Sequence, residues 1–340
     1  MTSLDWIGLR YWYALRRVRD TAERYRVTAR FNRAFGRRLA AARQLESAGV
    51  VWGFRSQCVE LFEAAARRGV PGLLEQVSLP RPVEAEVLEQ EAARWPGWEP
   101  GLALGQRTDP IYERQLREWE LAARIIAPSR YVARELERTG VERSKIRTIP
   151  IPVELDRFGL MGGRPLPRGA PLHVLCVGNV NLQKGIPYLL EALRALGPER
   201  VRGRFVGCVH LDRRRLAPYA EVAQFVGHVP RTQIAEEYRW AHVLAFPTLC
   251  DSFGNVQAEA MARGLPVVAT PNCGDVVRDG VDGRVVPIRS VEALAAALRA
   301  YIDDPALLAA HQRAAAAGRE RLGRVHYERG LAGLLAELVE

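Results

Sequence analysis

The sequence predicts an α/β protein of two domains, each built on a parallel sheet with helices on its faces. With 340 residues, 48% of them hydrophobic, the chain is long enough for two cores. From about residue 50 onward, short apolar runs alternate with helical patterns, which indicates parallel strands joined by helices. The Ile-Pro-Ile-Pro stretch at 149–152 interrupts this alternation, because proline removes ladder donors. We therefore expect an interdomain linker from there to the Gly/Pro-rich segment at 162–171.

The first domain is predicted to open with helix over residues 1–50, because aromatic and aliphatic residues recur there at three- and four-residue spacings. The basic, aromatic part from Trp6 to Arg19 also fits an amphipathic helix on a membrane surface, although packing within the domain is the favoured interpretation. Strands are then expected at 50–52, 70–74, 124–127 and 145–149, and helices at 56–68, 83–93, 110–124 and 130–139.

The second domain repeats the strand and helix alternation, as in a doubly wound sheet. We expect strands at 173–177, 204–209, 223–226, 242–246 and 266–269, and helices at 186–196, 232–239, 254–263 and 291–302. A last helix over 330–338 is predicted to return to the first domain. The predicted domains are therefore 1–155, 156–320, and a C-terminal segment 321–340.

Charge and cysteine content exclude several classes of protein. Residues 1–50 hold eleven arginines against four acids, so seven of the ten net positive charges lie there. Such a field suits anionic lipid or an acidic substrate; no motif indicates nucleic-acid binding. Five scattered cysteines support neither disulfides nor a zinc site. No apolar run is long enough to span a bilayer and no signal peptide is evident, so we expect a cytoplasmic protein.

Two loops that follow predicted strands carry the candidate chemistry. In 177–185, glycines flank a segment ending in Lys184, one of only two lysines, just before a helix whose N-terminus favours phosphate. In 246–262, Asp251 precedes a helix that contains Glu259, and free amides at that helix start suit a diphosphate. The structural alternatives are a solvated lysine, a helix-capping Asp251 and a paired Glu259.

The second loop resembles a known signature. Asp251-x7-Glu259, within D-S-F-G-N-V-Q-A-E-A-M-A, is similar to the E-x7-E signature of family 4 glycosyltransferases, and 271–283 is similar to the sugar-side loop of that family. The 177–185 loop resembles the V-G-x-x-x-x-x-K-G segment, and 126–132 resembles the last strand and helix of the first domain. The resemblance covers about residues 50–325 and implies a GT-B fold, two Rossmann-like domains facing a cleft. The N-terminal domain is here expected to be either abbreviated or incomplete, with upstream sequence missing.

The resemblance also implies residue roles. Lys184 would grip the donor diphosphate, Glu259 would hold the ribose and Asp251 would contact the donor sugar, which makes these three the predicted catalytic residues. The other predicted donor-binding residues are Gly178, Asn179, His228, Val229, Ser252, Phe253, Gly254, Asn255 and Val256.

Three features depart from the family pattern. Asn179 stands where the family has a phosphate-binding arginine, and all six histidines lie in the second half, so the first-domain histidine is absent. The chain also opens with helix where the family has a strand and a glycine-rich loop. Arg55, Glu75 and Arg81, near predicted strand ends, are weighed as acceptor-side residues, but ordinary ion pairing is the favoured interpretation.

The predicted function is transfer of a hexose, with retention, from a nucleoside-diphosphate sugar to a glycan, lipid-linked or small-molecule acceptor, without metal or cofactor. Two alternatives stay open. One is a donor-binding but inactive partner subunit, and the other is a peripheral membrane adaptor that binds anionic lipid on the inner membrane face through the basic N-terminus.

Overall fold

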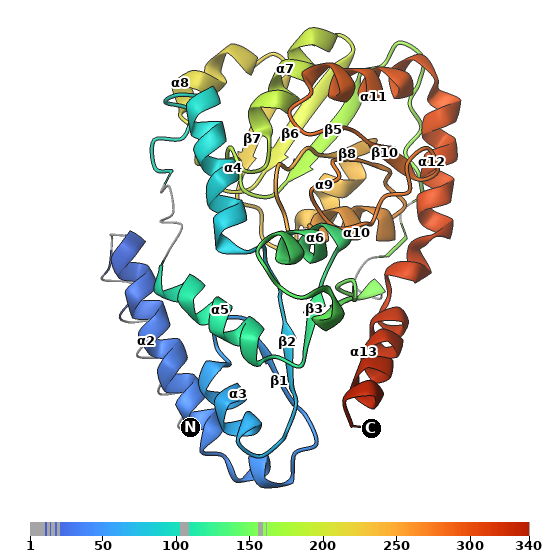
Figure 1. Ribbon diagram of the computed structural model, residues 1–340. Helices are drawn as coiled ribbons and strands as arrows, with labels where there is room; N and C mark the ends of the chain where they lie inside the picture. Colours follow the sequence, from blue (N-terminus) through green and yellow to red (C-terminus); the bar gives the residue numbers. More distant parts are fainter. Residues whose placement is uncertain are drawn as a thin grey trace. The chain divides into compact units, whose positions relative to one another are not determined.

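The computed structural model describes residues 11, 14, 18, 21–102, 109–155, 159, 160 and 162–339 (Figure 1). The chain divides into two compact units. The first comprises Met1–Ala85, Ala103–Ile149 and Arg329–Glu340, and the second comprises Glu86–Leu102 and Pro150–Glu328.

The first unit contains a parallel sheet whose strands lie side by side in chain order, β1-β2-β3-β4. They are β1 (Val51–Phe54), β2 (Gly72–Glu75), β3 (Arg124–Ala127) and β4 (Ile146–Thr148). Its helices are α2 (Thr21–Ala40), η1 (Arg43–Ser47), α3 (Val59–Ala66), the start of α4 (Arg81–Arg94), α5 (Pro110–Leu121), α6 (Arg130–Arg138), η2 (Arg143–Lys145) and most of α13 (Arg324–Val339). Strand order never reverses within this described sheet, so it corresponds to one half of a doubly wound sheet.

Buried charges fix the loop after β1 in the first unit. The Glu118 carboxylate on α5 accepts hydrogen bonds from the backbone amides of Ser56 (2.5 Å) and Cys58 (2.7 Å). Arg114, one turn earlier, binds both carboxylate oxygens of Glu60 on α3, at 2.9 and 2.7 Å, and donates to the Ser56 carbonyl. These contacts hold Ser56 at φ +67°, a left-handed conformation that residues other than glycine rarely adopt.

The C-terminal helix packs on the same unit. The Glu337 carboxylate accepts hydrogen bonds from Arg147 Nη2 (2.7 Å) and Arg124 Nε (2.9 Å), on β4 and β3. Gly330 lies against Ile149, where a Cβ at position 330 would meet the isoleucine side chain at 3.4 Å. The C-terminal residues thus belong to the first unit although the preceding chain belongs to the second.

The second unit contains a six-stranded parallel sheet in the order β10-β9-β8-β5-β6-β7. Its strands are β5 (Leu172–Val177), β6 (Val201–Val206), β7 (Ala223–Gly227), β8 (Val243–Phe246), β9 (Val267–Ala269) and β10 (Gly283–Val285). The helices are α7 (Ile186–Leu196), α8 (Arg213–Leu216), η4 (Ala217–Tyr219), α9 (Ile234–Trp240), α10 (Asn255–Ala262), α11 (Val291–Asp303), α12 (Pro305–Ala317) and η5 (Arg319–Leu322). Strand order reverses between β5 and β8, the switch point where doubly wound sheets bind ligands.

Residues 86–102 correct the predicted domain division. Chain order predicts that they belong to the first domain, yet the carboxylate of Glu91, with no exposed surface, accepts hydrogen bonds from Tyr188 Oη (2.8 Å) and Arg289 Nε (2.6 Å) of the second unit. Trp95 packs edge-on against Tyr188, with ring centroids 5.4 Å apart. Burial of this carboxylate and these rings places the segment in the second unit. The boundary predicted between residues 155 and 156 lies between residues 149 and 150 in the structure.

Most predicted elements are present, with local differences. Residues 124–127 and 186–196 match β3 and α7, whereas the strand predicted at 204–209 lies three residues earlier as β6. Arg202 and Arg204 break the apolar run of that strand, which hid its start. Helix is present over α2, but the amphipathic segment predicted from Trp6 to Arg19 lies outside the described residues except for 11, 14 and 18.

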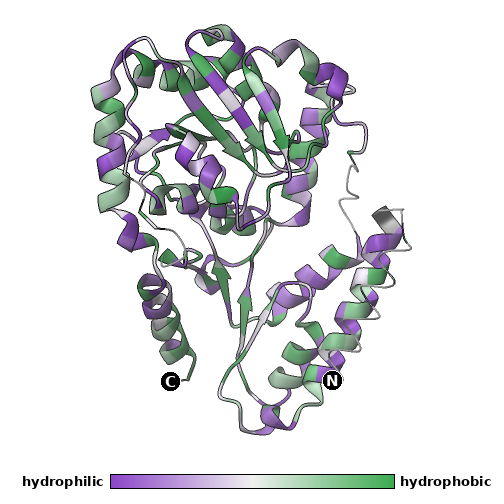
Figure 2. Ribbon diagram, turned by 180° about the vertical axis from the view of Figure 1, so that it is seen from behind, coloured by the Kyte–Doolittle hydropathy of each residue, from purple (hydrophilic) through white to green (hydrophobic). Residues whose placement is uncertain are grey.

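The helices alternate hydrophobic and hydrophilic residues along their length (Figure 2). In the part of the chain that the structure describes, none is both long enough and apolar enough to cross a membrane.

We expect the Glu118 contact to depend on pH. Burial raises the pKa of Glu118 to about 7 from an ordinary value of 4.5, so the folded protein favours the protonated acid. The resulting stabilisation is present below pH 4.5 and is lost as pH rises through 7. Urea unfolding measures the free energy of unfolding of the parent and of Glu118→Gln at pH 5 and at pH 8. The value for the parent minus the value for the variant should be about 2 kcal/mol lower at pH 8 than at pH 5. If the free energy of unfolding of the parent minus that of the variant is the same at both pH values, or is higher at pH 8, the prediction is wrong.

Candidate active site

The candidate site lies at the switch point of the second sheet, where the loops after β5 and β8 begin. These strands are direct neighbours, with Val174 opposite Val243. Because both run in the same direction, their following loops emerge at the same edge. The predicted residues Lys184 and Asp251, 67 positions apart in sequence, follow these two strands.

Gly185 lets the two loops approach each other. Its φ is +66°, in the left-handed region, and a Cβ at this position would collide with the Pro247 carbonyl oxygen. Position 185 therefore requires glycine for two reasons, the left-handed backbone conformation and the close approach of the Pro247 carbonyl oxygen. The Lys184 amide also donates to Asn181 Oδ1 at 3.1 Å, which shapes the turn before α7.

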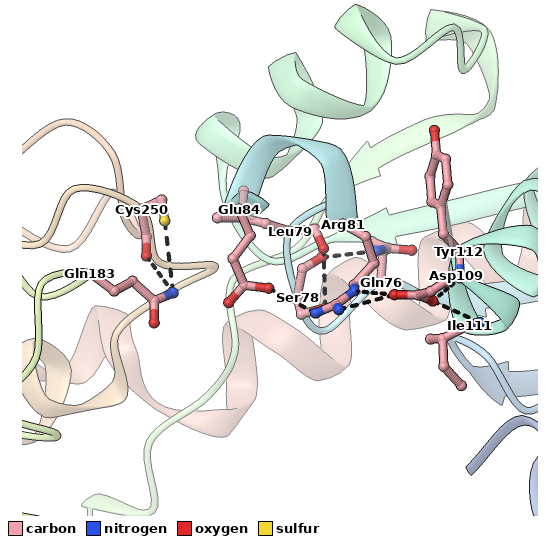
Figure 3. Close-up of polar contacts among 10 residues, drawn as sticks. All are labelled: Gln76, Ser78, Leu79, Arg81, Glu84, Asp109, Ile111, Tyr112, Gln183 and Cys250. Carbon is pink, nitrogen blue, oxygen red and sulfur yellow. Dashed lines mark hydrogen bonds and ion pairs between the residues drawn. The ribbon is translucent and has the colours of Figure 1, made fainter. Parts of the chain in front are cut away.

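Hydrogen bonds join the same two loops around this contact. The Leu249 amide donates to the Gln183 carbonyl at 2.9 Å. Gln183 Nε2 in turn donates to the Cys250 carbonyl at 3.2 Å (Figure 3). The Asp251 amide donates to the carbonyl of Asn272, after β9, at 2.9 Å. The residues on either side of Lys184 and Asp251 are thus fixed by main-chain contacts.

Lys184 and Asp251 form an ion pair between Nζ and Oδ2, with side chains only 20% and 16% exposed. The ammonium also lies 5.4 Å from the centroid of the Phe246 ring. Lys184 is therefore paired rather than simply solvated, and Asp251 faces the lysine rather than capping α10, whose N-cap is Gly254. The arrangement places one positive and one negative group side by side, suited to a ligand that carries both an anion and hydroxyl groups.

The first turn of α10 supplies backbone donors beside this pair. Its N-cap is Gly254, at φ +74°, which has no side chain to cap the first amides. Gln257 Nε2 holds the turn in place by donating to the carbonyls of Phe253 (2.6 Å) and Gly274 (3.1 Å). Predicted residues Ser252 to Val256 thus form a loop and helix start of the kind that binds phosphate.

Glu259 lies in the second turn of α10, where Tyr238 on α9 donates its hydroxyl proton to Glu259 Oε2 at 3.1 Å. Burial raises the pKa of Glu259, while Tyr238 and the charges of Arg231 and Arg263 act against that rise. The pKa of Tyr238 is itself raised well above its ordinary value by burial and by Glu259, so the phenol keeps the proton it donates. The carboxylate is held in one orientation with its other oxygen available.

Sequence reasoning missed Tyr238 and Arg231 as neighbours of Glu259. Tyr238 is 21 positions away and carries no motif, so only the packing of α9 against α10 reveals the contact. Arg231 had a weak signal, since it closely follows the predicted base-side residues His228 and Val229.

The remaining predicted donor residues lie at the same edge of the sheet. Gly178, at φ +131°, and exposed Asn179 follow β5, while exposed His228 and half-buried Val229 follow β7. Within the described residues, no hydrogen bond joins His228 or Val229 to Lys184 or Asp251. The structure thus places every predicted donor-site residue at one edge, and brings only Lys184 and Asp251 into direct contact.

In the first unit, Arg81 forms an ordinary ion pair, which is the favoured interpretation for this residue. Its Nη2 lies 3.0 Å from Asp109 Oδ2, and Asp109 caps α5 through the amides of Ile111 and Tyr112 (Figure 3). The Arg81 guanidinium also lies over the Tyr25 ring, 4.4 Å from its centroid. Glu75 is buried at the end of β2. Arg55 is half-buried, and burial lowers the pKa of its guanidinium.

No group of three or more His, Cys, Asp or Glu side chains suited to a metal ion occurs among the residues that the structure describes.

Comparison with protein families assigns both parts of the chain. Residues 171–304 match the model described as glycosyl transferases group 1, and residues 93–157 match the model for glycosyltransferase family 4. The chain is related to the family 4 glycosyltransferases. The two matched ranges include β3 and β4 of the first unit and the switch-point loops of the second, so the family relationship covers the candidate site.

Curated relatives of this family align with only part of their own length. Glycogen synthase of Mycobacterium tuberculosis is 29% identical over 255 residues, covering 71% of this chain and 58% of the relative. D-inositol 3-phosphate glycosyltransferase of Streptomyces avermitilis is 34% identical over 252 residues, covering 65% of this chain and 54% of the relative. The chain spans less than two thirds of the length of both.

Solved structures show the fold. HepE of Anabaena, crystallised with UDP, superposes with a TM-score of 0.66 at 17% identity, covering 92% of this chain and 82% of that one. Sucrose-phosphate synthase of Thermosynechococcus elongatus gives a TM-score of 0.67 at 21% identity, covering 92% and 78%. The α/β fold with two Rossmann-like units is therefore GT-B, as predicted.

We expect Gly185→Ala to destabilise the protein, since the added methyl group meets the Pro247 carbonyl in a strained backbone conformation. Urea unfolding should show a loss of about 1–3 kcal/mol. Gly333→Ala is the matched control, because no atom lies within 4 Å of a Cβ there and the position is helical, so a gain of about 0.5–1 kcal/mol is expected. Equal effects of the two substitutions would show that the loop contact is not needed.

Proposed function

We propose that the protein is a retaining glycosyltransferase that moves a hexose from a nucleoside-diphosphate sugar to a glycan, lipid-linked or small-molecule acceptor. The observation that carries this proposal is the Lys184 and Asp251 ion pair beside the uncapped start of α10, at the switch point of the sheet. That arrangement combines an ammonium and backbone donors for a diphosphate with a carboxylate for sugar hydroxyls.

The donor would bind in the following way. The diphosphate would take hydrogen bonds from the amides of the 252–256 segment and from Lys184, which would exchange part of its contact with Asp251 for phosphate oxygens. Freed in this way, Asp251 would accept hydrogen bonds from the sugar. Glu259, oriented by Tyr238, would accept bonds from the ribose hydroxyls. The acceptor would bind the first unit.

The metal-independent, retaining course is part of the same proposal. As the glycosidic bond breaks, negative charge develops on the leaving diphosphate, and the ammonium with the helix N-terminus would stabilise that charge in place of a divalent cation. Under this proposal the reaction needs no cofactor, so the nucleotide of the donor is the first thing to identify. UDP is the first nucleotide to test, because HepE was crystallised with UDP and with UDP-glucose.

An inactive, donor-binding subunit is the second candidate. It is favoured by one observation, exposed Asn179 at the end of β5, where the family resemblance leads one to expect an arginine. Binding of a nucleotide without release or transfer of sugar would identify it.

The cytoplasmic location and the contact of the basic N-terminus with anionic membranes stay predictions. Sedimentation with phosphatidylserine vesicles, at low and high salt, would test the membrane contact.

Lys184→Ala and Glu259→Ala should each lower nucleotide affinity at least tenfold, because each removes a charge-assisted contact worth about 1.5–3 kcal/mol. Calorimetric titration with UDP, GDP and ADP measures this, followed by assays of sugar release from the matching sugar nucleotides. Lys145→Ala is the control, since Lys145 is the other lysine and only donates to the carbonyls of Trp119 and Glu120 in the first unit. Unchanged affinity in both site variants would refute the proposed site.

Tyr238→Phe should weaken nucleotide binding a few-fold, because Glu259 loses the hydrogen bond that orients it. In the Glu259→Ala background the same substitution should have no further effect, so the two changes should be non-additive in a double-mutant cycle. Additive losses would show that Tyr238 acts on the nucleotide through some other route.

A further inference from the structure

A cavity lies on the second unit, away from the candidate active site. It has a volume of about 680 Å³ and lies between residues 159, 160 and 162–164, helix α9 and the end of α10. Two lining residues locate it, since Ala241 precedes β8 and Leu265 precedes β9. The cavity is therefore at the amino edge of the sheet, whereas Lys184 and Asp251 follow the carboxyl ends of β5 and β8.

The described walls of this cavity carry positive charge. Arg164, Arg239 and Arg263 line it, and no acidic residue is among its described lining residues. Arg263 is only 6% exposed, with its guanidinium 5.1 Å from the centroid of the Tyr238 ring. Arg239 pairs with Glu236 on the same helix, and Arg164 donates to the Trp240 carbonyl. The cavity thus collects three guanidinium groups from three separate segments.

The arginines act on one another and on their neighbours. Burial lowers the pKa of Arg263, and the nearby charge of Arg239 lowers it further, while Glu259 and Tyr238 act in the opposite direction. Burial also lowers the pKa of His242 to about 4, with contributions from His173 and Arg164. Burial, with a smaller contribution from positive charge, therefore favours the neutral form of His242, and a bound anion would relieve the repulsion among the arginines.

We propose that this cavity binds a small phosphorylated organic molecule, of the size of a sugar phosphate, at a site separate from the donor. Guanidinium groups bind phosphate oxygens in bidentate fashion, which matches the three arginines. Pockets for organic ligands have volumes of about 300–1,000 Å³, and the cavity falls within that range, larger than inorganic phosphate needs. Gly159, Gly162 and Gly163 add backbone groups along one wall.

The cavity is linked to the candidate donor site through one side chain. Arg263 lies over the ring of Tyr238, and the hydroxyl of Tyr238 donates to Glu259. A phosphate that draws Arg263 toward itself changes the position of the tyrosine that orients Glu259. Ligand in the cavity and nucleotide at the donor site then alter each other's affinity by the same factor. Binding in the cavity is independent of the proposed function; only this coupling rests on it.

The test is calorimetric titration of the full chain with ribose 5-phosphate and, separately, with inorganic phosphate, each with and without saturating UDP. Saturating UDP competes for the proposed donor site, and substitutions of Arg164 and Arg263 locate phosphate binding independently of the nucleotide that the donor site takes. We expect the sugar phosphate to bind at one site per chain with UDP present, more tightly than inorganic phosphate does. Absence of binding under those conditions overturns the proposal, and equal affinity for inorganic phosphate overturns its organic part.

Variants locate the site. Arg164→Gln and Arg263→Gln should each weaken ribose 5-phosphate binding about tenfold. Arg299→Gln, an exposed arginine of α11 in the same unit, should leave it unchanged. If Arg263→Gln does not fold, the double variant Arg164→Gln/Arg239→Gln tests the assignment instead. Both of these side chains are exposed, so their replacement should leave the fold intact. Parent-like affinity in the folded variants overturns the assignment. UDP titration of the same proteins reports on the donor site separately.

Discussion

The close approach of Gly185 to the Pro247 carbonyl is the constraint on which the candidate site depends. Without it, the loops after β5 and β8 could not share the hydrogen bonds of Gln183 with Leu249 and Cys250. Those bonds place a lysine and an aspartate in contact and leave the start of α10 beside them. The chemistry therefore rests on main-chain packing at the switch point of a parallel sheet, where neighbouring loops emerge from the same edge.

Buried carboxylates play the corresponding part elsewhere in the fold. Glu118 satisfies two amides of the loop after β1, and Glu91 is bound by a tyrosine and an arginine of the second unit. Each joins segments distant in sequence, and each is costly to bury unless all of its partners are present. These acids thus specify which segments belong together, and Glu91 does so for residues that the chain order assigns to the other unit.

The two edges of the second sheet carry different electrostatics. At the carboxyl edge, the positive charge of Lys184 is matched by Asp251, and the Glu259 carboxylate lies on the helix that follows. At the amino edge, three arginines surround a cavity whose described lining has no acid. The Tyr238 ring lies against Arg263 at the cavity and its hydroxyl donates to Glu259, so a single rigid side chain connects the cavity with the candidate active site.

The sequence by itself determined the α/β class and most strands and helices, and it predicted the donor-side residues, because apolar periodicity and loop motifs are local properties. It did not reveal the start of β6, where arginines interrupt the apolar run. It also did not reveal that residues 86–102 belong to the second unit, because helical periodicity does not say against which core Trp95 and Trp98 pack. Only the tertiary structure decided that Lys184 faces Asp251, that Tyr238 holds Glu259 and that three arginines share one cavity. The physical reason is that such contacts join residues far apart in the chain, and only packing sets the distances between them.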